Sequence, residues 1–512
     1  MSAIRHALST KRENDFAQWY QEVIAEAEMA EESGVRGCMV IKPWGYGIWE
    51  RMQRLMDDRI KDAGVDNCYF PLFIPLSYFS KEAEHVEGFA KEMAVVTHHR
   101  LIGDGKGGLV PDPEARLEEP LIVRPTSETV IGQAMGRWVQ SWRDLPLMTN
   151  QWANVVRWEM RTRMFLRTSE FLWQEGHTAH ADRDDAMAET LRALEMYREF
   201  AENVLAMPVI AGEKPENERF PGAVATYSIE AMMQDGKALQ AGTSHYLGTG
   251  FAKAAGISYQ DKEGTQQLCH TTSWGTSTRM VGGLIMTHGD DDGLRVPPAV
   301  APHQIVILPM LRDKPEDEAL LAYCEDLRKA LSAEQALGEK VRVLLDKRSG
   351  KAALKRWGWV KKGVPLILEI GGRDAENGQI TVVRRDRLWT EAGKVDFRAM
   401  AREDFVAMAA SELEDLQASL LAEAKAKRDA AITPLASFGE LADFFAETKK
   451  YPGWAEVLWS RPTGAALEEI VQRLKALKLT MRNTPMDAGP VEGPCIFTGD
   501  PAVERIYVAR AY

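Results

Sequence analysis

Apolar side chains recur at helical spacing between residues 47 and 63, at Ile48, Met52, Leu55, Met56 and Ile60. This stripe predicts an amphipathic helix with one buried face. Gly64 follows, at a position where helices commonly end. Short apolar runs then predict strands at residues 66–71, 121–125, 152–160 and 171–177, and a stretch rich in Ala, Glu and Leu at residues 185–205 predicts helices.

The pattern changes after VPPAVAP, residues 296–302, which we interpret as a linker. Predicted strands at residues 303–310, 340–346, 364–372 and 379–386 alternate with predicted helices at residues 316–331 and 350–358. This alternation is typical of a small α/β domain. From about residue 395 a long helical stretch leads to the final segment, IYVARAY. We therefore predict three domains, at residues 1–300, 301–400 and 401–512.

Composition excludes some classes of protein. No apolar run in the 512 residues approaches the length of about 18 that a membrane span needs, and the N-terminus lacks the pattern of a secretory signal. The five cysteines are scattered without a CxxC pair, which favours a reducing cytosol and argues against a structural zinc site. The net charge of −12 disfavours DNA, yet the basic segment 345–363 allows a local nucleic-acid surface.

One short stretch, RWEMRTRMFLRTSEFLWQEGH at residues 157–177, concentrates four arginines and three glutamates among aromatic residues. Guanidinium groups suit phosphate and carboxylate recognition. An aromatic ring such as that of Phe171 offers a flat surface to adenine. Glu159 and Glu175 could accept hydrogen bonds from an amine or hold magnesium beside phosphates. The stretch therefore indicates a nucleotide site that also holds a zwitterion, and a solvated hairpin with an ion-pair network is the alternative.

The same stretch resembles motif 2 of the class II aminoacyl-tRNA synthetases, and most of all that of the prolyl-tRNA synthetase family, in the archaeal and eukaryotic-like branch without an editing insertion. Five further blocks resemble that family in its order: RPTSETVI, NQWANVVRWE, QAGTSHYLG, SWGTSTRMVGGLIMTHGDDDGL and GVPLILEIGGRD. The resemblance implies an α/β (α+β) fold. It comprises an antiparallel sheet flanked by helices, an α/β anticodon-binding domain and a C-terminal α/β domain.

The resemblance also implies ATP-dependent activation of L-proline, followed by transfer to proline tRNA. Catalysis would rest on Arg157 and Arg279, because fixed cations stabilise the charge that develops at phosphorus. The residues implied for ATP are Arg157, Glu159, Arg167, Thr168, Phe171, Gln240, Thr243, Ser277 and Arg279. Those implied for proline are Thr126, Glu128, Arg157, Trp173, Glu175, His177, Phe220 and His245. Mg²⁺ would accompany ATP, and no protein metal site is expected.

Further expectations concern partners and departures from the family. We expect a cytoplasmic homodimer that uses residues 46–71, and an anticodon surface formed by residues 347–362 together with the GGRD turn. Many members of the branch carry four zinc-binding cysteines near the C-terminus. Here Cys495 stands alone in that region, so we expect no zinc. The family's GLVLPPR is GLRVPPA, with Ala299 in place of arginine and Arg295 four residues earlier. Tyr512 could reach the active site.

Two glycine-rich segments, IGDGKGGLV at residues 102–110 and GDDDG at residues 289–293, are interpreted as turns and not as nucleotide or calcium loops. His180 is interpreted as a core histidine. Three alternative functions stay open. They are a related synthetase for threonine, serine or glycine, a non-catalytic paralogue that binds tRNA or an amino acid as a regulator, and a carrier-charging ligase.

Overall fold

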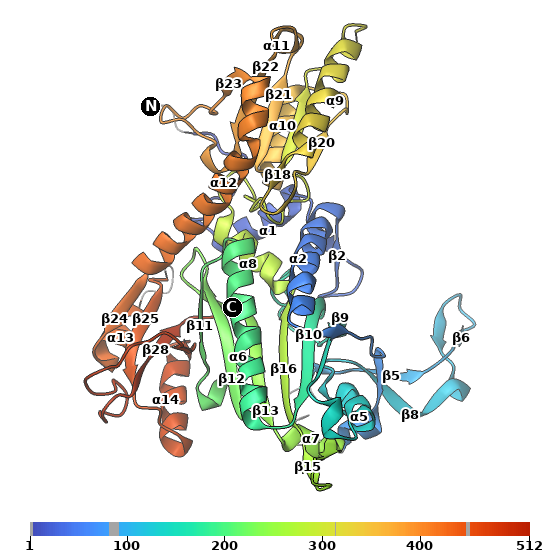
Figure 1. The fold of residues 1–512 in the computed structure, drawn as a ribbon, viewed down its shortest axis with the longest axis vertical. Helices are drawn as coiled ribbons and strands as arrows, with labels where there is room; N and C mark the ends of the chain where they lie inside the picture. The colour runs from blue at the N-terminus through green and yellow to red at the C-terminus, as the bar shows by residue number, and fades with distance from the viewer. Residues whose placement is uncertain (1–3, 81–91, 313, 447–450) are drawn as a thin grey trace.

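A computed structural model describes residues 4–80, 92–312, 314–446 and 451–512. Its largest sheet has eight strands and occupies the lower half of Figure 1. Their order in the sheet is β27 (Thr484–Pro485), β11 (Val209–Glu213), β12 (Ala225–Met232), β13 (Ala238–Gly248), β16 (His270–Ser277), β10 (Glu170–His180), β9 (Leu147–Val156) and β3 (Asp66–Asn67). Neighbouring strands are antiparallel except β3 and β9. The predicted antiparallel sheet is confirmed.

Helices cover this sheet unequally. α6 (Arg183–Glu199) packs along one face, where Tyr197 donates to Gln174 at 2.6 Å and Ser244 Oγ donates to the Thr190 carbonyl at 2.7 Å. Residues next along each strand point to the opposite face, which carries the cavity described below. Among the described residues, this part of the chain also contains the helices α1 (Phe16–Glu26), α2 (Pro43–Asp62), α3 (Leu76–Ser80), α5 (Glu128–Trp138), α7 (Gly250–Ala255) and α8 (Arg279–His288).

The sequence predicted most of these elements, with errors at their ends. The predicted helix 47–63 corresponds to α2, which ends one residue earlier, at Asp62, and begins earlier, at Pro43, because proline suits a first helical turn. The strand predicted at 66–71 is wrong beyond Asn67.

A three-stranded sheet of β4 (Phe73–Pro75), β8 (Arg116–Val123) and β5 (Ala94–His98) lies beside the main one. Small hairpins are formed by β1 (Ala30–Glu32) with β2 (Met39–Ile41) and by β14 (Ser258–Gln260) with β15 (Gln266–Leu268).

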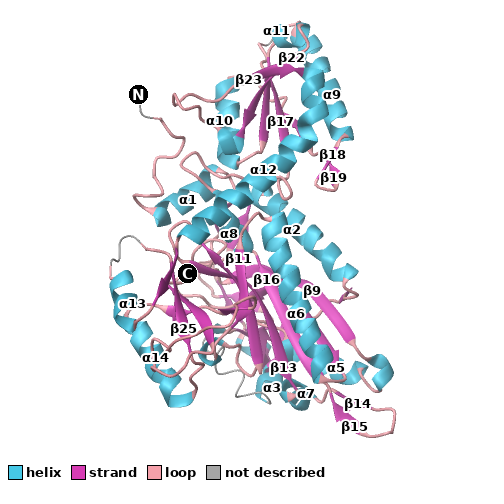
Figure 2. Cartoon of the chain, turned by 60° about the vertical axis from the view of Figure 1, so that its left-hand side comes forward, coloured by secondary structure: helices cyan, strands magenta, loops and turns pink. Residues whose placement is uncertain are grey.

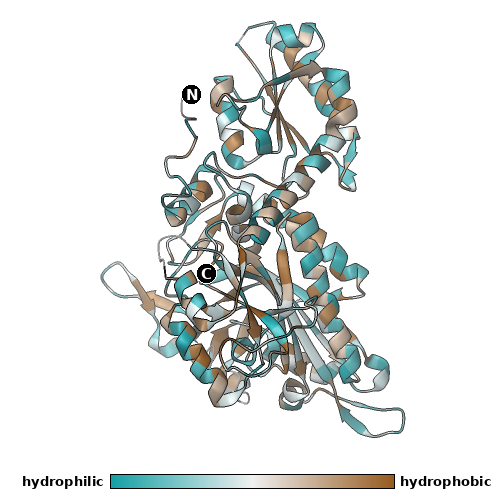
Figure 3. Cartoon of the chain, turned by 90° about the vertical axis from the view of Figure 1, so that its left-hand side faces the viewer, coloured by the Kyte–Doolittle hydropathy of each residue, from teal (hydrophilic) through white to brown (hydrophobic). Residues whose placement is uncertain are grey.

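A second, five-stranded sheet forms the upper body in Figures 1 and 2. Its order is β20 (Val343–Leu345), β17 (Ile305–Pro309), β21 (Leu366–Ile370), β22 (Gln379–Arg384) and β23 (Arg398–Ala401), and the first three strands are parallel. Its helices are α9 (Asp317–Ala333), α10 (Ala352–Lys362) and α11 (Gly372–Glu376), with a hairpin of β18 (Gln335–Ala336) and β19 (Glu339–Lys340). Its central strands are apolar, as Figure 3 shows. The predicted alternation of strands and helices is confirmed.

The long helix α12 (Arg402–Ala430) leads from this sheet to a third, with order β24 (Ile432–Leu435), β25 (Trp454–Trp459), β28 (Glu504–Ala509) and β26 (Thr480–Met481). α13 (Phe438–Phe444) and α14 (Gly464–Ala476) pack on it. The prediction of continuous helix from about residue 395 is wrong at β23, which pairs with β22 before α12 begins. No helix in the described ranges is long and apolar enough to cross a membrane.

The two glycine-rich segments differ in what they do. IGDGKGGLV lies in an exposed hairpin of β6 (Leu101–Gly103) and β7 (Leu109–Pro111). In GDDDG, at the end of α8, each aspartate binds a different part of the chain. Asp290 accepts from Arg385 at 2.7 and 2.5 Å, Asp291 from the Arg12 Nε at 3.2 Å, and Asp292 from the Trp389 Nε1 at 2.7 Å. This turn therefore joins α8 to the five-stranded sheet.

Candidate active site

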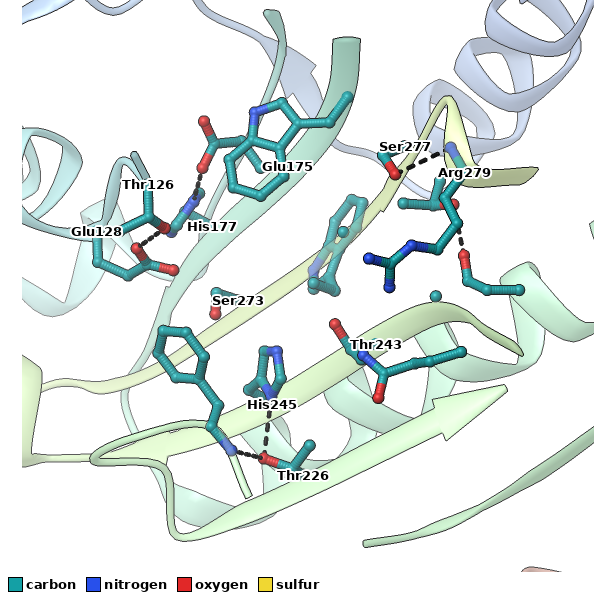
Figure 4. Close-up of a pocket in the computed structure, with 18 of the residues that line it drawn as sticks. Thr126, Glu128, Glu175, His177, Thr226, Thr243, His245, Ser273, Ser277 and Arg279 are labelled. Carbon is teal, nitrogen blue, oxygen red and sulfur yellow. Dashed lines mark hydrogen bonds and ion pairs between the residues drawn. The ribbon is translucent and has the colours of Figure 1, made fainter. Parts of the chain in front are cut away.

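A cavity of about 240 Å³ opens on the face of the eight-stranded sheet opposite α6. Residues of β10, β12, β13 and β16 form its floor, and the beginnings of α5 and α8 and the segment 218–220 form its rim. Figure 4 shows Thr126, Glu128 and His177 gathered at one end and Ser277 and Arg279 at the other. Two ends of different chemistry therefore share one cavity.

At one end lie two guanidinium groups. Arg157 follows β9; its Nε donates to the Pro125 carbonyl at 2.9 Å, and its guanidinium lies 5.6 Å from the ring centres of both Phe171 and Trp173. Arg279 is the first residue of α8, and its Nε donates to the Leu166 carbonyl at 3.1 Å. Burial lowers the pKa of Arg279 to about 10, and the positive charge of Arg157 adds to this. Both groups remain cationic at neutral pH and make this end positive.

The other end holds an acid and two histidines. Glu175 accepts hydrogen bonds from Ser127 Oγ at 2.5 Å and Gln151 Nε2 at 2.6 Å on one oxygen, and its second oxygen lies 2.9 Å from the His177 Nε2. Burial alone lowers the pKa of His177, but the hydrogen bond and the charge of Glu175 outweigh it, and the pKa lies above its ordinary value. The carboxylate is thus fixed in orientation by three donors.

On the opposite wall, the Phe220 ring packs against His245, with ring centres 4.8 Å apart and the ring planes tilted by 34°. His245 Nδ1 lies 3.0 Å from Thr226 Oγ1. Burial lowers the pKa of His245 to about 3, helped by the charges of His177 and Lys214. His245 is therefore neutral and, with Phe220, gives the cavity an apolar, aromatic wall. Thr126 Oγ1 donates to Glu128 at the rim.

Most of the residues that the sequence predicted for the site line this one cavity. Those that do are Thr126, Glu128, Arg157, Phe171, Trp173, Glu175, His177, Phe220, Gln240, Thr243, His245, Ser277 and Arg279. The structure does not bring the other three to the cavity wall. Arg167 donates to Glu159 at 2.8 Å in the loop between β9 and β10, and Thr168 is buried. Tyr512 does not line the cavity, and its hydroxyl donates to Asp235 at 2.6 Å.

Nine lining residues were not predicted as site residues: Glu218, Arg219, Thr226, Ala241, Gly242, Ser273, Trp274, Gly275 and Thr276. Strand alternation could have identified two of them. Ser273 lies on β16 at a period of two from Ser277, and Thr226 is the register partner of His245. The Ser273 hydroxyl and the Trp173 Nε1 are buried without a hydrogen-bond partner among the described residues, so both are available to a bound molecule.

The surroundings of His180 and Cys495 concern two further predictions, that His180 is a core histidine and that no zinc is bound. His180 Nδ1 lies 2.6 Å from Asp185, and its Nε2 lies 2.7 Å from Thr178 Oγ1, so it is a satisfied core histidine as expected. Over the described ranges, no three His, Cys, Asp or Glu side chains are grouped so as to hold a metal ion. Cys495 is buried in the core of the third sheet. The absence of zinc stays a prediction.

Comparison with known proteins identifies the family. Residues 112–288 match the tRNA synthetase class II core domain (G, H, P, S and T), and residues 304–414 match an anticodon binding domain. Relatives named proline–tRNA ligase are 75% identical in Novosphingobium aromaticivorans (100% of this chain, 99% of the relative) and 52% identical in Bdellovibrio bacteriovorus (99% of each).

A solved structure gives the same result. The prolyl-tRNA synthetase of Cryptosporidium parvum, solved with L-proline and AMP, superposes with a TM-score of 0.87 at 34% identity, over 99% of this chain and 97% of that one. The fold, the order of the motifs and the relatives agree over the whole length. The chain belongs to the prolyl-tRNA synthetase family of class II aminoacyl-tRNA synthetases.

Proposed function

We propose that the chain is a proline–tRNA ligase. It activates L-proline with ATP, releases pyrophosphate and transfers the prolyl group to the 3′ end of proline tRNA. The observation that carries this proposal is the single cavity whose one end holds Arg157 and Arg279 and whose other end holds Glu175, His177 and the Phe220–His245 pair. Phosphates suit the first end, and a small apolar ring with a secondary ammonium suits the second.

The chemistry needs positioning and charge stabilisation more than a protein nucleophile. A proline carboxylate oxygen attacks the α-phosphorus of ATP, an O–P bond forms, and the bond to pyrophosphate breaks with its electrons leaving on the pyrophosphate. The Arg157 guanidinium, 5.6 Å from the ring centres of Phe171 and Trp173, can bind both the carboxylate and the α-phosphate. Arg279, buried at the far end, stabilises the growing phosphate charge.

The proline end is organised for an ammonium group beside a hydrocarbon ring. Glu175, oriented by three donors, and Glu128 at the rim balance the positive charge. Trp173, His177 and the Phe220–His245 pair surround the ring. The Trp173 Nε1 and the Ser273 hydroxyl, which have no hydrogen-bond partner in the described part of the chain, are further donors that the substrate carboxylate or the phosphate can accept from.

ATP would rest on Phe171, Gln240, Thr243 and Ser277, which line the same cavity. Arg167 and Thr168 would close on the nucleotide from the loop between β9 and β10, and Glu159 would reach the adenine amine once Arg167 releases it. Magnesium bound to ATP needs few protein ligands. Glu218 and Gln240 would supply oxygens to it, and the ion would neutralise phosphate charge.

The tRNA surface we propose is smaller than the basic segment predicted from the sequence. Within that segment the Lys355 amine donates to the Asp346 and Arg348 carbonyls, and Lys361 and Lys362 pair with Glu26 and Glu28. The exposed cations are Lys347, Arg348 and Lys351, which lie after β20. The carboxyl ends of parallel strands meet at one edge, so this loop lies at the same edge as α11, which carries the GGRD residues.

The remaining proposals concern organisation. We infer a catalytic domain at residues 1–300, an anticodon-binding domain at 301–400 and a C-terminal domain at 401–512. A homodimer is supported by large apolar side chains left exposed around the motif 1 segment, with Tyr69 78% and Phe73 46% exposed.

About 100 residues separate His177 from Gly275. This length is too short for an editing insertion, which supports the archaeal and eukaryotic-like branch. We propose a cytoplasmic location and no zinc.

Charging of a tRNA transcript tests this function. Radiolabelled proline should be esterified to a proline tRNA transcript in the presence of ATP and Mg²⁺. A transcript with an altered anticodon should be charged more slowly, and Lys351→Ala should reduce that difference. A folded protein that binds ATP yet charges no tRNA would favour the non-catalytic paralogue.

A further inference from the structure

A buried carboxylate lies on the cavity face of the main sheet without lining the cavity itself. Glu230 on β12 is fully buried, and in the register of β12 with β13 it is the partner of Gln240, which lines the cavity. Thr226 and Ser228, at a period of two along the same strand, are the partners of His245 and Thr243. Glu230 therefore continues the row of side chains that forms one wall of the site.

Two buried cations hold this carboxylate. The Lys214 amine lies 3.0 Å from Oε1, and the Arg482 guanidinium donates to Oε2 at 2.7 and 3.2 Å. The exposed fractions of Lys214 and Arg482 are 3% and 5%. Burial alone raises the pKa of Glu230, but Arg482 and Lys214 outweigh it and bring the pKa to about 2. Glu230 is therefore ionised at neutral pH, and loss of one cationic partner would leave its buried charge less compensated.

Lys214 and Arg482 each belong to a segment of the chain that contacts the sheet or the rim of the cavity. Lys214 precedes the segment with the lining residues Glu218, Arg219 and Phe220, and its amide donates to the Thr226 carbonyl at 2.8 Å. The Phe220 amide donates to Thr226 Oγ1 at 3.0 Å. This segment is therefore fastened at both of its ends to Thr226 of β12, and the Lys214 side chain extends from it to Glu230.

Arg482 comes from the C-terminal part of the chain, between β26 of the third sheet and β27, which pairs with β11 as the edge strand of the main sheet. Its Nη1 also donates to Thr480 Oγ1 at 2.9 Å. The C-terminal part thus supplies both a strand and a buried charge to the sheet that carries the site.

We propose that Arg482 is a positioning residue for amino-acid activation. Through Glu230 and Lys214 it fixes the wall that carries Gln240 and the segment that carries Phe220, so the C-terminal part of the chain completes the substrate cavity. This inference rests on the proposed function and adds a residue that touches neither substrate.

The test compares full-length variants by ATP–pyrophosphate exchange, with active sites titrated and folding checked by circular dichroism. Arg482→Met should raise KM for both ATP and proline about tenfold, because small displacements of positioning groups cost that much or more, and should change kcat per active site less. Arg482→Lys should recover part of the loss. Arg461→Met, which removes an exposed ion pair of 2.9 Å between the same parts of the chain, should leave both KM values unchanged.

A double-mutant cycle of Arg482→Met and Glu230→Gln shows whether Arg482 acts through Glu230. Glu230→Gln alone should raise both KM values, and in its background Arg482→Met should add less than about twofold, since coupled residues are not additive. Wild-type KM values in a folded Arg482→Met or Glu230→Gln variant would overturn the inference. A variant with fewer active sites, in which the remaining sites keep the wild-type KM values, would also overturn it. If Arg482→Met does not fold, the KM values of Glu230→Gln alone test the inference. Absence of proline-dependent exchange in the wild type would instead contradict the proposed function.

Discussion

Glu175 and His177 lie two residues apart on β10 and share a hydrogen bond of 2.9 Å between Oε2 and Nε2, inside the cavity. Two residues apart on a strand means the same face, so local backbone geometry brings the pair together. Ser127 and Gln151 occupy the other oxygen of Glu175. The acid that we propose receives the substrate ammonium is thus oriented before substrate arrives.

Glu175→Gln should therefore weaken proline binding more than ATP binding. It removes a charge-assisted contact worth about 1.5–3 kcal/mol, so KM for proline should rise roughly ten- to a hundredfold while KM for ATP changes little. Steady-state exchange measures both. Equal effects on the two substrates would show that Glu175 supports the cavity as a whole. Glu189→Gln, on α6 behind the sheet, is the control, because Glu189 pairs with Arg192 outside the cavity.

His177 should give a characteristic dependence of stability on pH. Because its folded pKa lies above its ordinary value, its contribution is fully present below about pH 6.5 and is lost as the pH rises through the raised pKa. The urea midpoint of His177→Gln should therefore fall below that of the wild type by more at pH 6 than at pH 9.

His288 provides the control of opposite sign. Burial lowers its pKa to about 3, and its Nε2 lies 2.8 Å from the Leu205 carbonyl. Its contribution is present above about pH 6.5 and is lost as the pH falls toward the folded value. His288→Gln should thus differ most from the wild type at neutral pH and least near pH 4. The same pH trend in both variants would contradict these assignments.

Arg279 should contribute to the chemical step with little effect on folding. Arg279→Ala removes the cation that we propose stabilises the developing phosphate charge, and loss of a comparable group costs about 10²- to 10³-fold in kcat. The exchange rate per folded molecule measures this, with the thermal midpoint as the folding check. A variant that keeps more than about a third of the wild-type rate would remove Arg279 from the catalytic role.

Arg385 should matter for stability. It is 2% exposed and binds Asp290 through two hydrogen bonds at the junction of α8 with the five-stranded sheet. Arg385→Met leaves Asp290 without that partner and should cost about 3 kcal/mol. Urea unfolding measures the loss. Arg387→Met, from an exposed pair of 3.2 Å with Asp415, should cost less than about 1 kcal/mol.

The sequence predicted the elements with strong periodicity and the residues within resembling motifs. The helix at residues 47–63 and the strands of the five-stranded sheet were found because their apolar spacing is regular. Thirteen of the sixteen predicted site residues line the cavity. Arg167 and Glu159 do not, because they satisfy each other in an exposed loop, and pairing across a loop leaves no periodic signal.

Contacts between residues far apart in the sequence could not be predicted from the sequence. Glu230 and Arg482 are about 250 residues apart and come together only because β27 adds to the edge of the catalytic sheet. GDDDG was correctly predicted as a turn, but the partners of its three carboxylates lie in other parts of the fold. Arg295, the departure from the family pattern, pairs with Glu423 of α12 at 2.9 Å, which explains its place near the domain junction.

The most direct measurement is ATP–pyrophosphate exchange with each of the twenty amino acids in turn. Exchange that depends on proline, with weaker signals from alanine or cysteine because a pocket for proline discriminates poorly against smaller side chains, is the predicted result. Exchange with a different amino acid would contradict the roles given to Glu175, His177 and Phe220 while keeping the ATP site. Exchange with none, from folded protein that binds ATP, would contradict the ligase activity itself.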